Sequence, residues 1–258
     1  MDDIIKAHKL EFNYLVSRKA NIALILLLPV ITITVLGISM PMDFAVGYIE
    51  NTDEPLNALT EDDAKFTEDG YLRILSYMFS LLILFSAIQM GSLRIVAERA
   101  PYGTLDREIL GIGRHSMLIG KFTANFIFAG VQALLILITG LLWFNFNNPA
   151  EVLSVLISLA FFGVAYGLLI SVFVKTKDQA QQLVIISIGL FLILTGFSYP
   201  IVEDIKPLSE NLPMSISISG IEEIIVSGSY VFTGIIKILI TGILCLSFAA
   251  VKFSSEQD

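Results

Sequence analysis

Cysteine, histidine and charge are all scarce in this sequence. The 258 residues include one cysteine, Cys245, so no disulfide can form within the chain and no cysteine-rich metal site is possible. The two histidines, His8 and His115, are too far apart for the zinc-protease helix motif, which has two histidines four residues apart. Only 16% of residues are charged, and the net charge is -8, so a basic nucleic-acid-binding surface and most soluble enzymes are excluded.

Long apolar stretches dominate the rest of the chain. Apolar residues make up 55% of it, and the mean hydropathy is +0.79. A membrane-spanning helix needs about 20 mainly apolar residues, because each adds ~1.5 Å against a hydrocarbon core of ~30 Å. Six stretches qualify: residues 21–40, 74–93, 122–144, 152–174, 183–201 and 231–251. The sequence therefore predicts an all-α polytopic membrane protein, with residues 1–258 forming one transmembrane domain of six helices.

The distribution of Lys and Arg predicts the orientation. With the N-terminus inside, the inner segments carry twelve of these residues and the outer segments carry three, while Lys237 falls within the last stretch. Cytoplasmic loops are enriched in Lys and Arg. The first stretch is too long for the core of a cleaved secretion signal, which has ~7–15 residues, so we expect it to be retained. These patterns predict a multi-pass protein of the cell membrane with both termini in the cytoplasm.

Residues 4–18 have the pattern of an amphipathic helix. Ile4, Ile5, His8 and Phe12 recur near one face, whereas charged and polar residues such as Glu11 mostly occupy the rest. Such a helix can lie at the cytoplasmic interface of the membrane. A short helix packed on protein is the alternative, and the pattern favours the interface.

The two outer segments differ in pattern. Residues 43–50 alternate like a short strand, and residues 51–69 are acidic enough to predict a solvated loop. The ligand spacing of a calcium-binding loop is missing from this acidic stretch. Residues 202–230 are too polar to span a membrane, but Ser219 to Glu222 matches a capping box and predicts short helices at the outer interface.

Polar residues within the predicted membrane helices are the candidates for a translocation path. Gln89, Asn125 and Gln132 are uncharged, and hydrogen bonds between helices, worth ~0.6–2 kcal/mol each, explain them without a ligand. Lys237 either extends to the interface or contacts a substrate or counter-ion. Close helix packing, rather than a pathway, is the expected role of Gly130, Gly140, Gly163 and Gly167.

No catalytic constellation is evident, so the chain is not expected to be an enzyme. Gly120-Lys121 resembles the end of a phosphate-binding loop, but the first glycine of that motif is misplaced and Phe122 replaces its Ser or Thr. We therefore expect this chain itself to bind neither ATP nor a metal.

The most informative segment joins the second and third apolar stretches. Thr104 can cap a helix, Asp106 suits its positive N-terminal end and Gly111 suits its end. Leu105 and Ile109 are four residues apart and share a face. A helix of about two turns is marginal alone in water, so it packs either on its own bundle or on another protein.

This segment resembles the first cytoplasmic loop of ABC-2 type transporter permeases. The matching residues are Glu98, Arg99, Gly103, Thr104, Leu105, Ile109, Leu110, Arg114, Gly120 and Lys121. Asp106 stands where the family usually has glutamate, and the proline common in the family's turn is absent. Pro29, the stretch 44–50 and Leu212-Pro213-Met214 are also similar to the family pattern.

The resemblance implies the permease subunit of an ATP-driven transporter, most members of the family being exporters that work by alternating access. A short coupling helix would dock on a separate ATP-binding subunit through Glu98, Gly103, Thr104, Leu105, Asp106, Arg107, Glu108, Ile109 and Leu110. Two permease chains, expected as a homodimer, would join two ATP-binding subunits, which bind ATP and Mg²⁺.

The main rival prediction is a secondary transporter or channel that works without ATP. It is disfavoured because the predicted helices contain almost no Asp, Glu or His, the residues that proton-driven carriers usually place there. A membrane enzyme would need paired catalytic residues, which the sequence lacks. A membrane assembly factor that transports nothing remains a further alternative.

Overall fold

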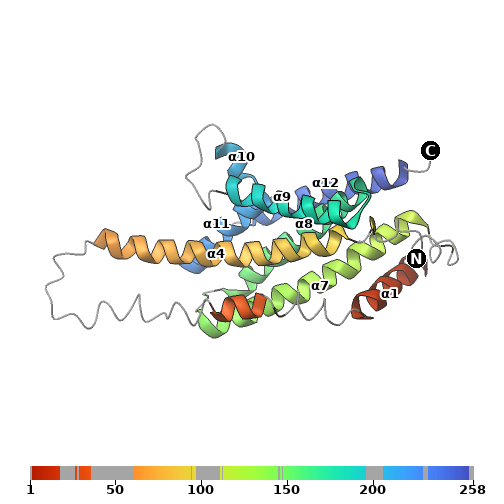
Figure 1. Cartoon of the computed structure of the whole chain (residues 1–258). Helices are drawn as coiled ribbons and strands as arrows, with labels where there is room; N and C mark the ends of the chain where they lie inside the picture. The colour runs from red at the N-terminus through yellow and green to blue at the C-terminus, as the bar shows by residue number, and fades with distance from the viewer. Residues whose placement is uncertain are drawn as a thin grey trace.

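The computed structural model describes residues 2–17, 27, 29–35, 61–93, 95–96, 111, 113–144, 146, 148–195, 206–228 and 232–255. Throughout these ranges the chain is helical or forms short turns, and no strand occurs in them. The helices are α1 (Asp2–Ser17), α4 (Glu61–Ser92), α7 (Arg114–Trp143), α8 (Pro149–Phe173), α9 (Lys177–Leu194), α10 (Lys206–Glu210), α11 (Pro213–Ser227) and α12 (Thr233–Ser255) (Figure 1).

Five helices in the described part of the chain are long and apolar enough to cross a membrane. They cover Arg73–Ser92, His115–Trp143, Pro149–Phe173, Lys177–Leu194 and Thr233–Ser255. These helices correspond to the last five apolar stretches found in the sequence. The first stretch, residues 21–40, lies mostly outside the described residues, although residues 29–35 are helical; the strand expected at residues 43–50 lies entirely outside them.

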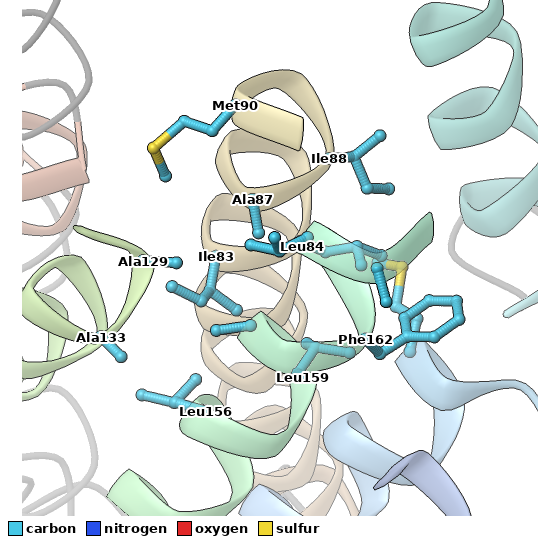
Figure 2. Packing of buried hydrophobic residues seen from close by; sticks show 14 of the residues in the cluster. Ile83, Leu84, Ala87, Ile88, Met90, Ala129, Ala133, Leu156, Leu159 and Phe162 are labelled. Carbon is cyan, nitrogen blue, oxygen red and sulfur yellow. The ribbon is translucent and has the colours of Figure 1, made fainter. Parts of the chain in front are cut away.

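Helix α8 forms the centre of the bundle. It packs against α4, α7, α11 and α12, and most of its side chains are buried. Figure 2 shows Leu156 and Leu159 of α8 beside Ile83 and Leu84 of α4. Lipid is as apolar as these side chains, so close packing rather than removal from water holds such helices together.

Glycines allow α4 and α8 to approach closely. A Cβ atom at Gly91 would lie 2.6 Å from the carbonyl oxygen of Val164, and one at Gly163 would lie 2.7 Å from Cβ of Ala87. A Cβ at Gly167 would overlap the carbonyl oxygen of Ile88. The packing role predicted for Gly163 and Gly167 is therefore confirmed.

The other two glycines singled out in the sequence behave differently from each other. A Cβ at Gly140 of α7 would lie 2.7 Å from Cζ of Phe79, which confirms its packing role. No atom lies within 4 Å of a Cβ built at Gly130. The packing prediction for Gly130 is wrong, because this glycine is on a part of α7 that faces no neighbouring helix in the described structure.

The helices run between two ends of the bundle. His115 at the start of α7 is 3.3 Å from the hydroxyl of Ser254 at the end of α12, so these two termini lie at one end. The first helix, α1, packs beside the start of α7 at this same end (Figure 1). We call it the basic end, because it carries Lys6, Lys9, Lys121, Lys175, Lys177 and Lys252.

The opposite end is formed by the start of α4, the end of α9 and the two short helices. Ser80 of α4 is 2.9 Å from Ser217 of α11, and the Tyr77 hydroxyl donates to the carbonyl oxygen of Thr195. The short helices expected between the last two apolar stretches are present as α10 and α11.

The expected start of the second short helix was wrong. Helix α11 begins at Pro213, a residue suited to the first turn because it has no N–H to leave unpaired, with Leu212 as its N-cap. Ser219 and Gly220 therefore lie within the helix rather than at its start. The face of α11 that packs on the bundle includes Ile221 and Ile224, which are fully buried.

Two further boundaries differ from the sequence prediction. Residues 61–69 were expected in an acidic loop, but α4 already begins at Glu61. Acidic side chains near a helix N-terminus interact favourably with the helix dipole, so Glu61, Asp62 and Asp63 suit a first turn. Helix α9 begins at Lys177 rather than at residue 183, because Thr176 caps it by accepting from the N–H of Gln179.

Candidate functional site

The predicted coupling residues lie outside the described residues. They are Glu98, Gly103, Thr104, Leu105, Asp106, Arg107, Glu108, Ile109 and Leu110. The structure does describe residues on either side of this segment. Gly111 has a φ of 61°, a left-handed conformation that glycine adopts readily, which agrees with its predicted position after a helix end.

The chain leaves α4 through a capped turn. Leu93 forms the turn after α4, and Ile95 and Val96 are helical again. Their two N–H groups donate to Oγ of Ser171 on α8, at 2.9 and 3.1 Å. All three residues are buried. A side chain of α8 thus satisfies backbone donors that a helix start leaves unpaired.

Helix α1 docks on the start of α7 at the basic end. Gly120 allows the close contact, since a Cβ there would lie 2.7 Å from Cβ of Ala7. His8 Nδ1 is 3.1 Å from Oγ1 of Thr123. The Thr123 hydroxyl also lies within hydrogen-bonding distance of the carbonyl oxygens of Ile119 and Gly120, one turn earlier in α7.

A buried ion pair reinforces this docking. The ammonium group of Lys121 lies 3.3 Å from Oε2 of Glu11, and the two side chains are only 4% and 5% exposed. The sequence placed Glu11 among the charged and polar residues away from the apolar face of the first helix, but the structure buries it against α7. The pair is buried because Glu11 shares the face of α1 that contacts α7, one turn after Ala7.

Among the described residues of α1, two large apolar side chains remain exposed. Ile5 is 59% exposed, and Phe12 is 38% exposed although its ring lies 5.4 Å from that of Phe128 on α7. Packing on protein, the alternative kept from the sequence, therefore accounts for the face of α1 that meets α7. The exposed parts of Ile5 and Phe12 agree with contact to lipid.

Two of the candidate path residues are buried and hydrogen-bonded within the bundle. Gln132 of α7 accepts from the hydroxyl of Ser86 on α4 at 2.5 Å. The amide of Asn125 donates to the carbonyl oxygen of Lys121 at 2.6 Å, within the same helix. Both side chains are fully buried, whereas Gln89 is only partly buried. Hydrogen bonding thus explains Gln132 and Asn125 without a ligand.

Lys237 lies apart from these residues, at the opposite end. Its side chain is exposed, and its ammonium group donates to Oδ1 of Asn211 in the turn between α10 and α11, at 3.2 Å. A lysine near a helix end commonly extends in this way toward the membrane surface. The contact ties the last long helix to the two short ones.

A group of hydroxyl contacts at the opposite end was not predicted from the sequence. Besides the contacts of Ser80 and Tyr77, the Ser209 hydroxyl donates to the carbonyl oxygen of Leu194 at 2.5 Å. The guanidinium carbon of Arg73 lies 5.8 Å from the centre of the Tyr77 ring. Arg73, Tyr77 and Ser80 recur at helical spacing, and that spacing was the signal available in the sequence.

The described residues contain no group of three or more His, Cys, Asp or Glu side chains that could hold a metal ion. The buried polar groups are mainly hydroxyls and amides, together with the ion pair of Glu11 and Lys121. Their contacts join two helices, cap a helix or lie within one helix. Their arrangement supports helix packing rather than bond-making chemistry.

Comparison with known proteins gives two matches. The sequence model of the family described as ABC-2 type transporter matches residues 13–226. The linearmycin resistance permease protein LnrN of Bacillus subtilis (strain 168) is 32% identical over 186 residues. That alignment covers 69% of this chain and 46% of the relative, so the chain matches about half the length of that protein.

Proposed function

This chain belongs to the ABC-2 type transporter family as a membrane permease, which itself has no ATPase activity. We propose that a separate ATP-binding subunit drives it to export its substrate. The observation that carries the proposal is the match over residues 13–226, which includes the whole segment 98–110 between α4 and α7. In this proposal the ATP-binding subunit holds ATP and Mg²⁺, and residues 1–258 act as one transmembrane domain.

Two observations support six crossings rather than five. Helix α1 packs at the basic end, whereas α4 starts at the opposite end, so residues 18–60 have to connect the two ends. Ile33, within that connection, is fully buried in the same core as the five described spans. One further crossing by residues 21–40 satisfies both observations.

The charge distribution supports a cytoplasmic location for the basic end. Lys6, Lys9, Lys121, Lys175 and Lys177 are at this end, and Lys-rich loops face the cytoplasm. The segment 98–110 joins α4 and α7 at the same end, where a cytosolic ATP-binding subunit can reach it. With that orientation, α1 lies along the inner membrane interface and α10 and α11 lie at the outer one.

The working unit in this proposal contains two permease chains, as a homodimer, and two ATP-binding subunits. ATP binding closes the ATP-binding subunits, and the coupling helix transmits this movement to the bundle. Linearmycin is the first cargo to assay, because the matched relative is named a linearmycin resistance permease.

The experiment that tests this proposal changes the predicted coupling helix. Leu105→Arg places a charge where an apolar anchor is expected, and loss of such an anchor costs about 2–4 kcal/mol at an interface hot spot. Asp106→Ala removes only a charge at a helix start, worth about 0.3–1 kcal/mol, and is the matched control. We expect Leu105→Arg to lose the co-purifying ATP-binding subunit at normal membrane levels, while Asp106→Ala keeps most of it.

Two results would contradict the proposal. If Leu105→Arg retains the ATP-binding subunit and its ATP-dependent transport at the unmodified level, this segment does not couple the subunits. If the unmodified chain transports its cargo in vesicles that lack nucleotide, the rival prediction of a secondary transporter or channel is correct.

A further inference from the structure

Three small residues of α8 face α4 at intervals of about one turn, and the last of them is a serine. Gly163, Gly167 and Ser171 are spaced by four residues, so they share one face of α8. Gly163 and Gly167 bring the backbone of α4 into contact at Ala87 and Ile88. Figure 2 shows these two residues of α4 on the side of the helix where α8 passes.

Ser171 continues this contact beyond the end of α4. Because α4 runs parallel to α8 here, the residues after its last turn arrive beside Ser171. The serine oxygen accepts from the N–H groups of both Ile95 and Val96, at 2.9 and 3.1 Å, and is itself fully buried. Buried backbone N–H groups need a hydrogen-bond partner, and Ser171 supplies one to both amides.

The two capped residues come directly before the segment 97–110. A displacement at the start of that segment therefore pulls on Ile95 and Val96 and, through their hydrogen bonds, on the end of α8. Since α8 packs on α4, α7, α11 and α12, a displacement of its end would shift its contacts with most of the bundle.

We infer that Ser171 is a positioning residue for coupling, which fixes the start of the 97–110 segment to α8 so that the central helix moves with the ATP-binding subunit. The attachment of Ile95 and Val96 to α8 rests on the hydrogen bonds and can be tested separately. Only the coupling to the ATP-binding subunit rests on the proposed function.

Three variants separate the hydrogen bonds from simple packing. Ser171→Ala removes the acceptor, and Ser171→Cys keeps the shape of the side chain, with a slightly larger atom, but offers only a weak acceptor. Ser158→Ala is the matched control, since Ser158 is equally buried on α8 and its hydroxyl donates to the carbonyl oxygen of Val155 in its own helix. If Ser171 acts by packing, Ser171→Cys should behave like the unmodified protein in the two readouts below. If it acts by hydrogen bonding, Ser171→Cys should behave like Ser171→Ala.

The first readout is hydrogen–deuterium exchange at the amides of Ile95 and Val96 in the purified full-length protein. Loss of the shared acceptor should speed their exchange about tenfold or more in Ser171→Ala and Ser171→Cys, with no change in Ser158→Ala. Unchanged exchange in both Ser171 variants would overturn the inference. Should Ser171→Ala fail to accumulate, Ser171→Cys carries the same comparison.

The second readout is the rate of ATP hydrolysis by the complex relative to the ATP-binding subunit alone. Both Ser171 variants should still bind that subunit, but the change in rate caused by the permease should shrink about fivefold. An unchanged ratio, with the subunit bound, would overturn the positioning role and leave the proposed function intact. Failure of the unmodified permease to bind any ATP-binding subunit would contradict the proposed function instead, and the exchange result would stand alone.

Discussion

Gly167 and Gly130 differ in their surroundings, and the difference makes opposite predictions for the same substitution. Gly167→Ala places a methyl group against the backbone of α4, so we expect it to destabilise the protein by about 1–3 kcal/mol. Gly130→Ala meets no atom within 4 Å, and replacing a glycine within a helix should stabilise by about 0.5–1 kcal/mol. Thermal unfolding in detergent measures both changes. Equal midpoints for the two variants would show that α4 and α8 are not packed as closely as described.

The ion pair between Glu11 and Lys121 makes the second residue-scale prediction. Removing one partner of a buried ion pair leaves a charge without compensation and costs about 3–5 kcal/mol. We expect Glu11→Leu to release α1 from α7, detected as faster tryptic cleavage after Lys6 and Lys9. The double variant Glu11→Leu with Lys121→Met should restore much of the protection, because no buried charge is then left.

Lys9→Met serves as the control for this experiment, since Lys9 lies on the exposed face of α1. It removes one cleavage site but should leave cleavage after Lys6 unchanged. If Glu11→Leu leaves that cleavage unchanged as well, the ion pair does not hold α1 in place.

At the scale of the helices, the described ends predict which positions are reached from outside the cell. Glu210 of α10 and Lys177 at the start of α9 are both exposed and lie at opposite ends of the bundle. In a Cys245→Ser background, a membrane-impermeant thiol reagent should label Glu210→Cys in intact cells. It should label Lys177→Cys only after the membrane is permeabilised. The reverse pattern would invert the proposed orientation.

The helices themselves were largely predictable from the sequence, because the length of an apolar stretch is set by the thickness of the bilayer. Five of the six stretches correspond to the long helices of the structure, with shifted ends. The ends were harder, since polar residues can extend a helix beyond the membrane. Glu61 and Lys177 show this, because each begins a helix within a segment too polar to have been assigned to a span.

The contacts of individual polar residues were less predictable. Periodicity shows which residues share a face of a helix, but it does not show what that face meets. Glu11, for example, was grouped with the polar residues away from the apolar face of its helix, whereas it forms a buried ion pair with Lys121 of α7. Ser171 gave no signal at all, because a serine within an apolar stretch has the same appearance whether it bonds its own helix or caps another segment.

At the scale of the whole molecule, apolar surface remains on the outer helices. Phe248 and Val251 of α12 and Ile185 and Ile193 of α9 are each more than half exposed. Such faces are expected of helices that contact lipid or a second permease chain.

The measurement that tests the coupling of this permease to ATP most directly is the mass of the complex purified from its own host membrane. Native mass spectrometry of that complex should give two permease chains and two ATP-binding chains, and the Leu105→Arg variant should give permease chains alone. A permease that is purified from the unmodified host without any ATP-binding chain, yet still moves its cargo in vesicles, would contradict the proposed mechanism.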